Sequence, residues 1–108
     1  MDVMKRMVSN IKDKNYFEKN VLKSTGYVFI DYYAPWCGPC KRFAPTLDKL
    51  CEEYKNIKFY KIDVDELSDI GADQKISAFP TFVLYKDGIE QNRIIGASEE
   101  KVRNLLSV

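Results

Sequence analysis

Histidine is absent from this chain of 108 residues, and so is any long uninterrupted apolar run. Without histidine, and with only three cysteines, the chain offers a poor ligand set for zinc, so we expect no metal site. Asp31 interrupts the longest apolar stretch, which excludes a membrane-spanning helix. The formal net charge is only +1, so we expect neither nucleic acid nor a membrane surface as a partner.

The first ten residues lack the apolar run of a secretory signal, because Asp2, Lys5 and Arg6 interrupt them. Three cysteines without such a signal indicate a reducing compartment, and we expect a cytoplasmic protein. The length suits a single domain over residues 1–108, which would bury about two-thirds of its unfolded surface and need no disulfide for stability. We expect this domain to be a monomer.

Apolar and turn-forming residues follow one another in a pattern that predicts alternating strands and helices. The predicted strands are Lys5–Ser9, Tyr27–Tyr33, Ile57–Asp63, Thr81–Tyr85 and Ile89–Ile95. The predicted helices are Lys14–Lys23 after an Asp13 cap, Lys41–Lys55 directly after the cysteines, a short helix capped by Asp65 that ends near Asp73, and a last helix capped by Ser98. Asp87-Gly88 predicts a tight hairpin turn. The order predicts an α/β fold, with a central mixed sheet of four to five strands and helices on both faces.

The segment Trp36-Cys37-Gly38-Pro39-Cys40 lies where the second predicted strand ends and a helix begins. Two cysteines three residues apart can be metal ligands, a structural staple or a redox pair. On a helix such residues lie about 5–6 Å apart, within reach of a disulfide, and the unpaired N–H groups of a first turn favour a thiolate. Pro39 suits a first turn, and Gly38 lets another sulfur approach. This context favours a redox pair over a turn without function.

Asp31 and Cys51 each allow two interpretations. A carboxylate within an apolar strand is costly to bury in its ionised form, so burial would raise the pKa of Asp31 and let it exchange protons near neutrality. The alternative is a carboxylate directed into solvent. Cys51 lies eleven residues after Cys40, too far along a helix to bond with it. Its spacing places it on the buried helix face, so we expect a core residue, with a regulatory thiol as the alternative.

Further single residues and short motifs accompany the cysteines along essentially the whole chain. They are Asp31 six residues before Cys37, the pentapeptide 36–40, Lys41, Pro45, Lys61, Asp63, Pro80-Thr81, Gly88 and Gly96. Together they resemble the thioredoxin family, whereas Cys-x-x-Cys alone would not be specific. The resemblance implies a thioredoxin fold and the reduction of protein disulfides by dithiol–disulfide exchange.

The resemblance implies a role for each matching residue. Cys37 would attack a client's disulfide, and Cys40 would resolve the mixed disulfide and close a Cys37–Cys40 bond. Cys37, nearer the helix start, should be the more exposed and the more acidic of the two. Asp31 would act as general base toward Cys40, with Lys61 as its partner. The residues that tune the redox pair would be Gly38, Pro39 and Pro80, the last in a cis peptide bond. The apolar rim that receives an extended client segment would consist of Trp36, Ala78, Phe79, Pro80, Gly96 and Ala97.

The resemblance also implies partners. Electrons would come from NADPH through a thioredoxin reductase, with no cofactor bound to this chain. Clients would be disulfide-containing proteins such as peroxiredoxins, in electron transport and cell redox homeostasis.

Two alternatives on the same fold remain. An oxidase or isomerase of the protein disulfide isomerase type often has a histidine between its cysteines, whereas Pro39 fills that position here. A binding module would keep the fold without catalysis, and the presence of both cysteines, Asp31 and Pro80 argues against it.

Overall fold

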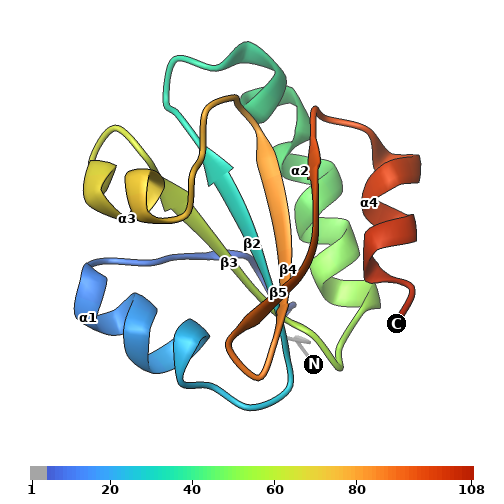
Figure 1. Ribbon diagram of the computed structural model, residues 1–108. Coiled ribbons are helices and arrows are strands. Elements are labelled where there is room, and N and C mark those ends of the chain that lie inside the picture. The colour runs from blue at the N-terminus through green and yellow to red at the C-terminus, as the bar shows by residue number, and fades with distance from the viewer. Residues whose placement is uncertain (1–4) are drawn as a thin grey trace.

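The computed structural model describes residues 5–108, and its elements follow the predicted order (Figure 1). The strands are β1 (Ser9–Asn10), β2 (Tyr27–Tyr33), β3 (Lys58–Asp63), β4 (Thr81–Lys86) and β5 (Ile89–Ile95). The helices are α1 (Lys14–Phe17), the π-helix η1 (Glu18–Leu22) that continues it, α2 (Gly38–Glu53), α3 (Ser68–Asp73) and α4 (Glu99–Leu106). The strands form one mixed sheet in the order β1-β3-β2-β4-β5, so the predicted α/β architecture is confirmed.

β2 is the central strand of the sheet. It runs parallel to β3 on one side and antiparallel to β4 on the other, while β1 and β5 form the edges. Five of its seven residues are buried, because helices cover both faces of the sheet. The strand therefore holds the residues at its C-terminal end, just before the cysteines, on a rigid support.

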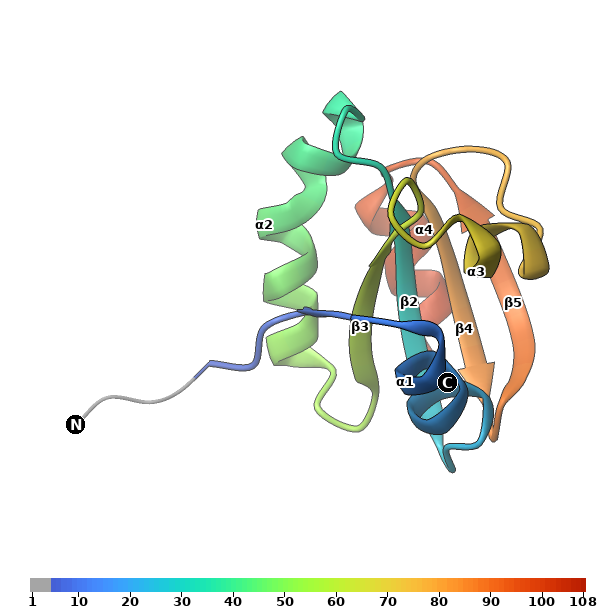
Figure 2. The ribbon, with the colours of Figure 1, turned by 90° about the vertical axis from the view of Figure 1, so that its left-hand side faces the viewer.

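Helices α2 and α4 lie on one side of the sheet, and α1 and α3 lie on the other (Figures 1 and 2). The core under α2 and α4 includes Phe29, Phe43, Leu47, Leu50, Cys51, Phe59, Phe82, Leu84, Val102, Leu105 and Leu106. The core under α1 and α3 includes Phe17, Val21, Val28, Ile30, Tyr32, Ile62, Ile70, Val83 and Tyr85. Successive residues of β2 thus enter opposite cores, as the alternation of side chains along a strand requires. Within residues 5–108, no helix is both long and apolar enough to cross a membrane.

The main cap and turn signals of the sequence are confirmed. The Asp13 carboxylate accepts a hydrogen bond from the Tyr16 N–H at 2.8 Å and caps α1. Ser98 caps α4 in the same way, at 3.3 Å. Asp87 and Gly88 have φ angles of 51° and 80°, which suit the two-residue turn between β4 and β5.

The edge strand expected over Lys5–Ser9 is wrong in its extent. Only Ser9 and Asn10 are in register with β3. The preceding residues bind to α2 instead, because the backbone N–H groups of Arg6 and Val8 donate to two carboxylates of that helix, at 2.9 and 3.2 Å. Side chains of α2 therefore replace the strand partner that the sequence pattern suggests.

The predicted cap of α3 is also wrong. The helix begins at Ser68, and the residue before it, Leu67, makes no side-chain cap. Asp65 cannot serve, because it lies inside a turn that the Asp63 carboxylate closes, accepting from the Asp65 N–H at 3.0 Å. The helix itself ends at Asp73, as expected.

Candidate active site

Cys37 and Cys40 lie at the junction between β2 and α2. The helix begins at Gly38, so Cys37 is its N-cap and Cys40 belongs to its first turn. The two cysteines form a disulfide, with their Cα atoms 5.3 Å apart. The Cys37 Sγ accepts a hydrogen bond from the Cys40 N–H at 3.2 Å, and so fills the place of the side-chain oxygen in an ordinary N-cap. The unpaired N–H groups in the first turn of α2 favour a negative charge on this sulfur once the disulfide is reduced.

The expectation that Cys37 is the more exposed cysteine is wrong for the oxidised protein. Cys37 is 4% exposed and Cys40 is 8% exposed. The reason is that the Cys37 sulfur is turned toward the helix start, while both cysteines pack against Ala34 and the partly buried Phe79. The surrounding side chains, rather than the position in the helix, therefore control access to this sulfur.

Asp31 lies on β2 and lines a cavity of about 300 Å³ together with Cys40 and Lys61. Asp31 is 8% exposed, and among the described residues its Oδ1 has no hydrogen-bond partner. Burial raises the pKa of Asp31 from 3.8 to about 7, and the charge of Lys61 opposes part of this rise. The predicted burial and raised pKa are confirmed, and the solvent-directed alternative is wrong. The cavity has room for a water between Asp31 and Cys40.

Lys61 is the cross-strand neighbour of Asp31, since the two residues are paired in register between β3 and β2. Its ammonium group lies 5.9 Å from the centre of the Tyr33 ring, in a cation–π contact. The ion pairs found within residues 5–108 include none between Lys61 and Asp31. Lys61 therefore acts on the pKa of Asp31 through its charge at a distance, not through a direct hydrogen bond.

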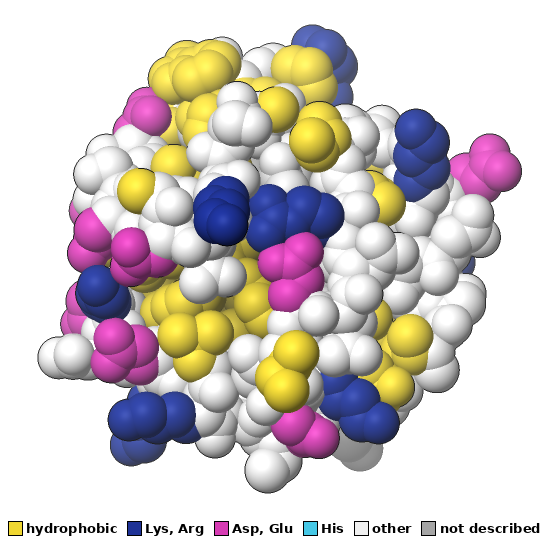
Figure 3. All heavy atoms as spheres, in the orientation of Figure 1, with side chains coloured by type: hydrophobic (Ala, Val, Ile, Leu, Met, Phe, Trp, Pro, Cys, Tyr) yellow, Lys and Arg dark blue, Asp and Glu magenta, His cyan; other side chains and the backbone are white. Residues whose placement is uncertain are grey.

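The loop before β4 brings further predicted site residues to the same end of the sheet. The Phe79–Pro80 peptide bond is cis, as the resemblance implied. The Phe79 ring lies edge-to-face with Trp36, at 5.6 Å between ring centres, and Trp36 is 66% exposed. The Gly96 N–H donates to the Pro80 carbonyl at 2.9 Å, so the Gly96–Ala97 segment joins this loop. Hydrophobic side chains gather at this end of the molecule, at the top of Figure 3.

The backbone just before Pro80 has unused hydrogen-bonding groups. Within the described part of the chain, the N–H groups of Ala78 and Phe79 donate to no acceptor. The Ala78 carbonyl accepts from the Thr81 hydroxyl at 2.7 Å, which fixes the loop locally. An extended segment of another protein can therefore pair with this backbone beside the disulfide. The arrangement as a whole is suited to disulfide exchange with a bound peptide segment.

Two residues of this end, Arg42 and Ile95, belong to none of the motifs found in the sequence. The Arg42 guanidinium folds over Gly38, where a Cβ would lie 3.1 Å from its Nη1, and it lines a cavity of about 210 Å³ with Ala97. Its position four residues after Gly38 on a helix is the signal that could have found it. Ile95 is 57% exposed next to Gly96, and no sequence signal distinguishes it from a core residue of β5.

Cys51 lies in the core, as predicted. It is a free cysteine with 1% exposure on the buried face of α2. Burial raises the pKa of its thiol. A buried neutral thiol is a poor nucleophile, so the folded protein offers Cys51 no part in disulfide exchange.

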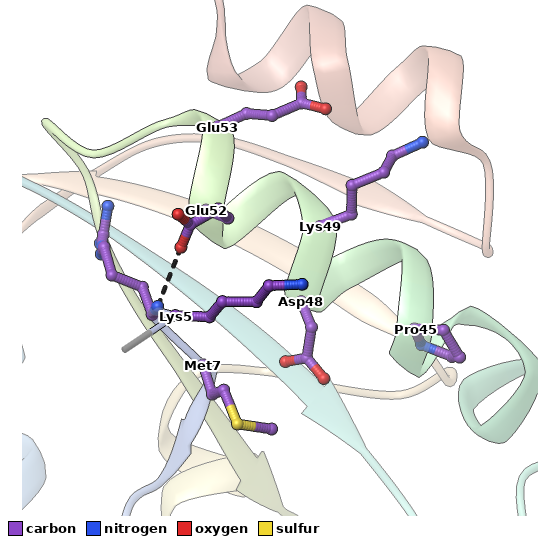
Figure 4. Close-up of a pocket in the computed structure, with 8 residues that line it drawn as sticks. Lys5, Met7, Pro45, Asp48, Lys49, Glu52 and Glu53 are labelled. Atoms are coloured by element: carbon purple, nitrogen blue, oxygen red, sulfur yellow. Dashed lines mark hydrogen bonds between the residues drawn. The ribbon is translucent and has the colours of Figure 1, made fainter. Parts of the chain in front are cut away.

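A separate cavity of about 360 Å³ lies where the segment before β1 crosses the outer face of α2 (Figure 4). Lys5, Met7 and Asp48 line it, and the Arg6 N–H donates to Glu52 at its edge. Neither active-site cysteine lines this cavity. Within residues 5–108, no three or more His, Cys, Asp or Glu side chains are grouped so as to hold a metal ion.

Comparison with known sequences gives a consistent result. The family model described as Thioredoxin matches residues 7–107. Thioredoxin-2 of Saccharomyces cerevisiae is 36% identical over 101 residues, which cover 94% of this chain and 97% of the relative. Thioredoxin Asp f 29 of Aspergillus fumigatus is 44% identical over 97 residues, or 88% of each chain. Mitochondrial Thioredoxin-3 of S. cerevisiae is 48% identical over 80 residues, which cover 74% of this chain and 63% of the relative.

Solved structures share the fold. The thioredoxin Mala s 13 of Malassezia sympodialis has a TM-score of 0.89 at 34% identity, over 99% of this chain and 95% of its own. A chain from a structure on the thiol resolving mechanism in yeast mitochondrial 1-Cys peroxiredoxin, via glutathione/thioredoxin systems, has a TM-score of 0.86 at 37% identity, over 92% of both chains. The thioredoxin fold expected from the sequence is confirmed.

Proposed function

Because the chain belongs to the thioredoxin family and is a thiol–disulfide oxidoreductase that reduces protein disulfides, we propose that Cys37 and Cys40 divide this reaction into two steps. In the first, the Cys37 thiolate attacks one sulfur of the client's disulfide, and the other client sulfur leaves as a thiolate. In the second, the Cys40 thiolate attacks the Cys37 Sγ, which closes the Cys37–Cys40 bond and releases the second client thiolate. Two electrons thus pass from the two thiols to the client, and the client thiolates take up protons.

We propose that Asp31 is the base that accepts the proton of the Cys40 thiol. Cys40 must lose this proton before it can attack, and Asp31 lines the same cavity. With a pKa of about 7, the Asp31 carboxyl is about half ionised at neutral pH and can accept the proton through a water. The positive charge of Lys61 keeps the pKa from rising further, so Asp31 stays available as a base.

We propose that the client segment binds to the apolar rim around the disulfide. The unused N–H groups of Ala78 and Phe79 would pair with its backbone, beside the cis Pro80. Trp36 and the Gly96–Ala97 segment would contact its side chains. Neither of the two residues between the cysteines, Gly38 and Pro39, has a charged side chain, which supports a reducing rather than an oxidising protein.

The cycle requires an electron donor outside this chain. We propose NADPH as the source and a thioredoxin reductase as the partner, with the two thiols as the only electron carriers that this chain contributes. Peroxiredoxins are proposed clients, since a chain of the same fold belongs to a structure concerned with a 1-Cys peroxiredoxin. We further propose that residues 1–108 act as a monomeric domain in the cytoplasm, in electron transport and redox homeostasis, because the cycle needs a reducing compartment.

The observation that carries this proposal is that Cys37 caps α2 while its sulfur is bonded to Cys40. In Cys40→Ser, the second step is blocked, so incubation with a cell extract should trap clients as mixed disulfides on Cys37 that dithiothreitol releases. Cys37→Ser is the control and should trap none. Equal trapping by both variants, or none by Cys40→Ser, would refute the assigned order of attack.

A further inference from the structure

The Arg93 side chain, on β5, holds the start of the loop that carries Ala78 and Phe79. Its guanidinium donates to the backbone carbonyls of Gln74 at 2.9 Å and Lys75 at 3.2 Å, just after the end of α3. Glu90, three residues earlier on β5, accepts two further hydrogen bonds from Arg93, both at 2.7 Å. Arg93 thus joins the edge strand of the sheet to the end of a helix that flanks it.

The backbone that Arg93 holds has an unusual conformation. Lys75 has a φ of 58°, in the left-handed region where helix ends usually carry glycine. The carbonyls at the end of a helix lack helical partners and carry partial negative charge, which suits a guanidinium group. Arg93 therefore stabilises a backbone conformation that a lysine rarely adopts.

Two buried tyrosines fix the same helix end to the middle of the sheet. The Tyr85 hydroxyl, from β4, donates to the side-chain carbonyl of Gln74 at 2.7 Å. The Tyr32 hydroxyl, from β2, lies at hydrogen-bond distance from that of Tyr85, 2.7 Å away. Gln74 is consequently held by its side chain from the central strands and by its carbonyl from Arg93.

We propose that Arg93, held in place by Glu90, is a positioning residue for client binding. It fixes the start of the loop over residues 74–80, and thereby directs the unused N–H groups of Ala78 and Phe79 toward an incoming client. The far end of the loop has its own supports, the Thr81 hydroxyl on the Ala78 carbonyl and the Gly96 N–H on the Pro80 carbonyl.

The physical basis is the entropy of the loop. A loop that is fixed at both ends loses less conformational freedom when a client pairs with it, so affinity for the client rises. Every side-chain hydrogen bond of Arg93 goes to Glu90 or to the end of α3, so the Arg93 side chain acts on binding and not on the reacting sulfurs. The inference rests on the proposed pairing of clients with Ala78 and Phe79.

The test compares Arg93→Gln and Arg93→Lys with the control Arg103→Gln. Arg103 is a matched control because its side chain is 35% exposed, against 29% for Arg93, and because it also binds carboxylates. It lies on α4, across the sheet from α3 (Figure 1). Each protein is assayed for reduction of insulin with dithiothreitol as electron donor. Its reduced form is also reacted with 5,5′-dithiobis(2-nitrobenzoate), a disulfide that offers no peptide backbone to the loop.

We expect both Arg93 variants to raise the KM for insulin about tenfold, equivalent to about 1.4 kcal/mol, with kcat changed less than about twofold. The rate constant with the small disulfide should stay at the wild-type value, and Arg103→Gln should behave as wild type. Arg93→Lys should not restore the wild-type KM, because one ammonium group cannot reproduce the forked hydrogen bonds by which the guanidinium joins Glu90 to two carbonyls.

An unchanged KM, an equal fall in the rate with the small disulfide, or rescue by Arg93→Lys would overturn the positioning role. If Arg93→Gln fails to fold, Glu90→Gln removes the support of Arg93 and should raise the KM in the same direction; an unchanged KM there would also overturn it. A wild-type protein that cannot reduce insulin would instead refute the proposed function.

Discussion

Replacing Asp31 with asparagine should stabilise the oxidised protein, and by an amount that grows with pH. Burial raises the pKa of Asp31 from 3.8 to about 7, so the folded protein prefers the protonated acid. Below about pH 3 the acid is protonated in both states, and it makes no difference to stability. As the pH rises toward 7, the unfolded chain gives up the proton while the folded protein keeps it, so the stability of the wild type falls.

The two pKa values set the size of this effect. Their difference corresponds to about 4 kcal/mol, at 1.36 kcal/mol for each pKa unit. Linkage then gives a loss of about 2 kcal/mol at pH 5 and about 4 kcal/mol from pH 7 upward. Asparagine cannot ionise, so Asp31→Asn should recover these amounts, reduced by roughly 1–3 kcal/mol if the new amide group finds no partner.

The assay is guanidinium unfolding of the oxidised wild type and Asp31→Asn at about pH 4, 5.5, 7 and 8.5. The disulfide keeps Cys37 and Cys40 from titrating, so they do not contribute to the pH dependence. Asp65→Asn serves as a control, because Asp65 is an exposed carboxylate. A stability difference that is the same at every pH, or one that shrinks as the pH rises, would refute the reasoning.

Three further outcomes follow from burial and backbone geometry. Gly88→Ala should cost about 3 kcal/mol or more, because a Cβ at Gly88 would overlap the carbonyl oxygen of Leu22. Gly26→Ala, with a similar φ of 83° but open space, should cost only about 1–2 kcal/mol, and equal losses in urea unfolding would contradict this. Cys51→Ala should lower the free energy of unfolding by about 1 kcal/mol without changing insulin reduction. Cys51 of the native protein should resist iodoacetamide, and rapid labelling would disprove its burial. Asp31→Asn should slow the release of clients from the mixed disulfide by on the order of 10²-fold at neutral pH, an effect that stopped-flow measurements should find smaller at alkaline pH.

Local signals in the sequence are sufficient to predict most of the fold. The apolar stretch of β2 predicts a strand covered on both faces, and the turn at Asp87-Gly88 needs only two residues that tolerate positive φ. Asp13 and Ser98 cap their helices through residues within a single turn. In each of these cases the residues that decide the structure are neighbours in the sequence.

Two of the wrong predictions share a different cause, since they depend on residues far apart in the chain, whereas the Asp65 cap of α3 is wrong because of its near neighbour Asp63. The segment before β1 binds carboxylates of α2, 46 residues away in the case of Arg6 and Glu52. The low exposure of Cys37 results partly from Phe79, which a distant loop supplies. The partners of Arg93 near the end of α3 are 18 and 19 residues away, and no short motif describes them. Sequence spacing located the cysteines, whereas the packing around them required the structure.

The central claim is that the start of α2 stabilises the thiolate of Cys37. Its most direct test is the rate of iodoacetamide reaction with the reduced protein, followed at Cys37 by mass spectrometry across a range of pH. The titration midpoint should lie well below about 8.5, the pKa of a free cysteine. A midpoint at or above that value would contradict the claim.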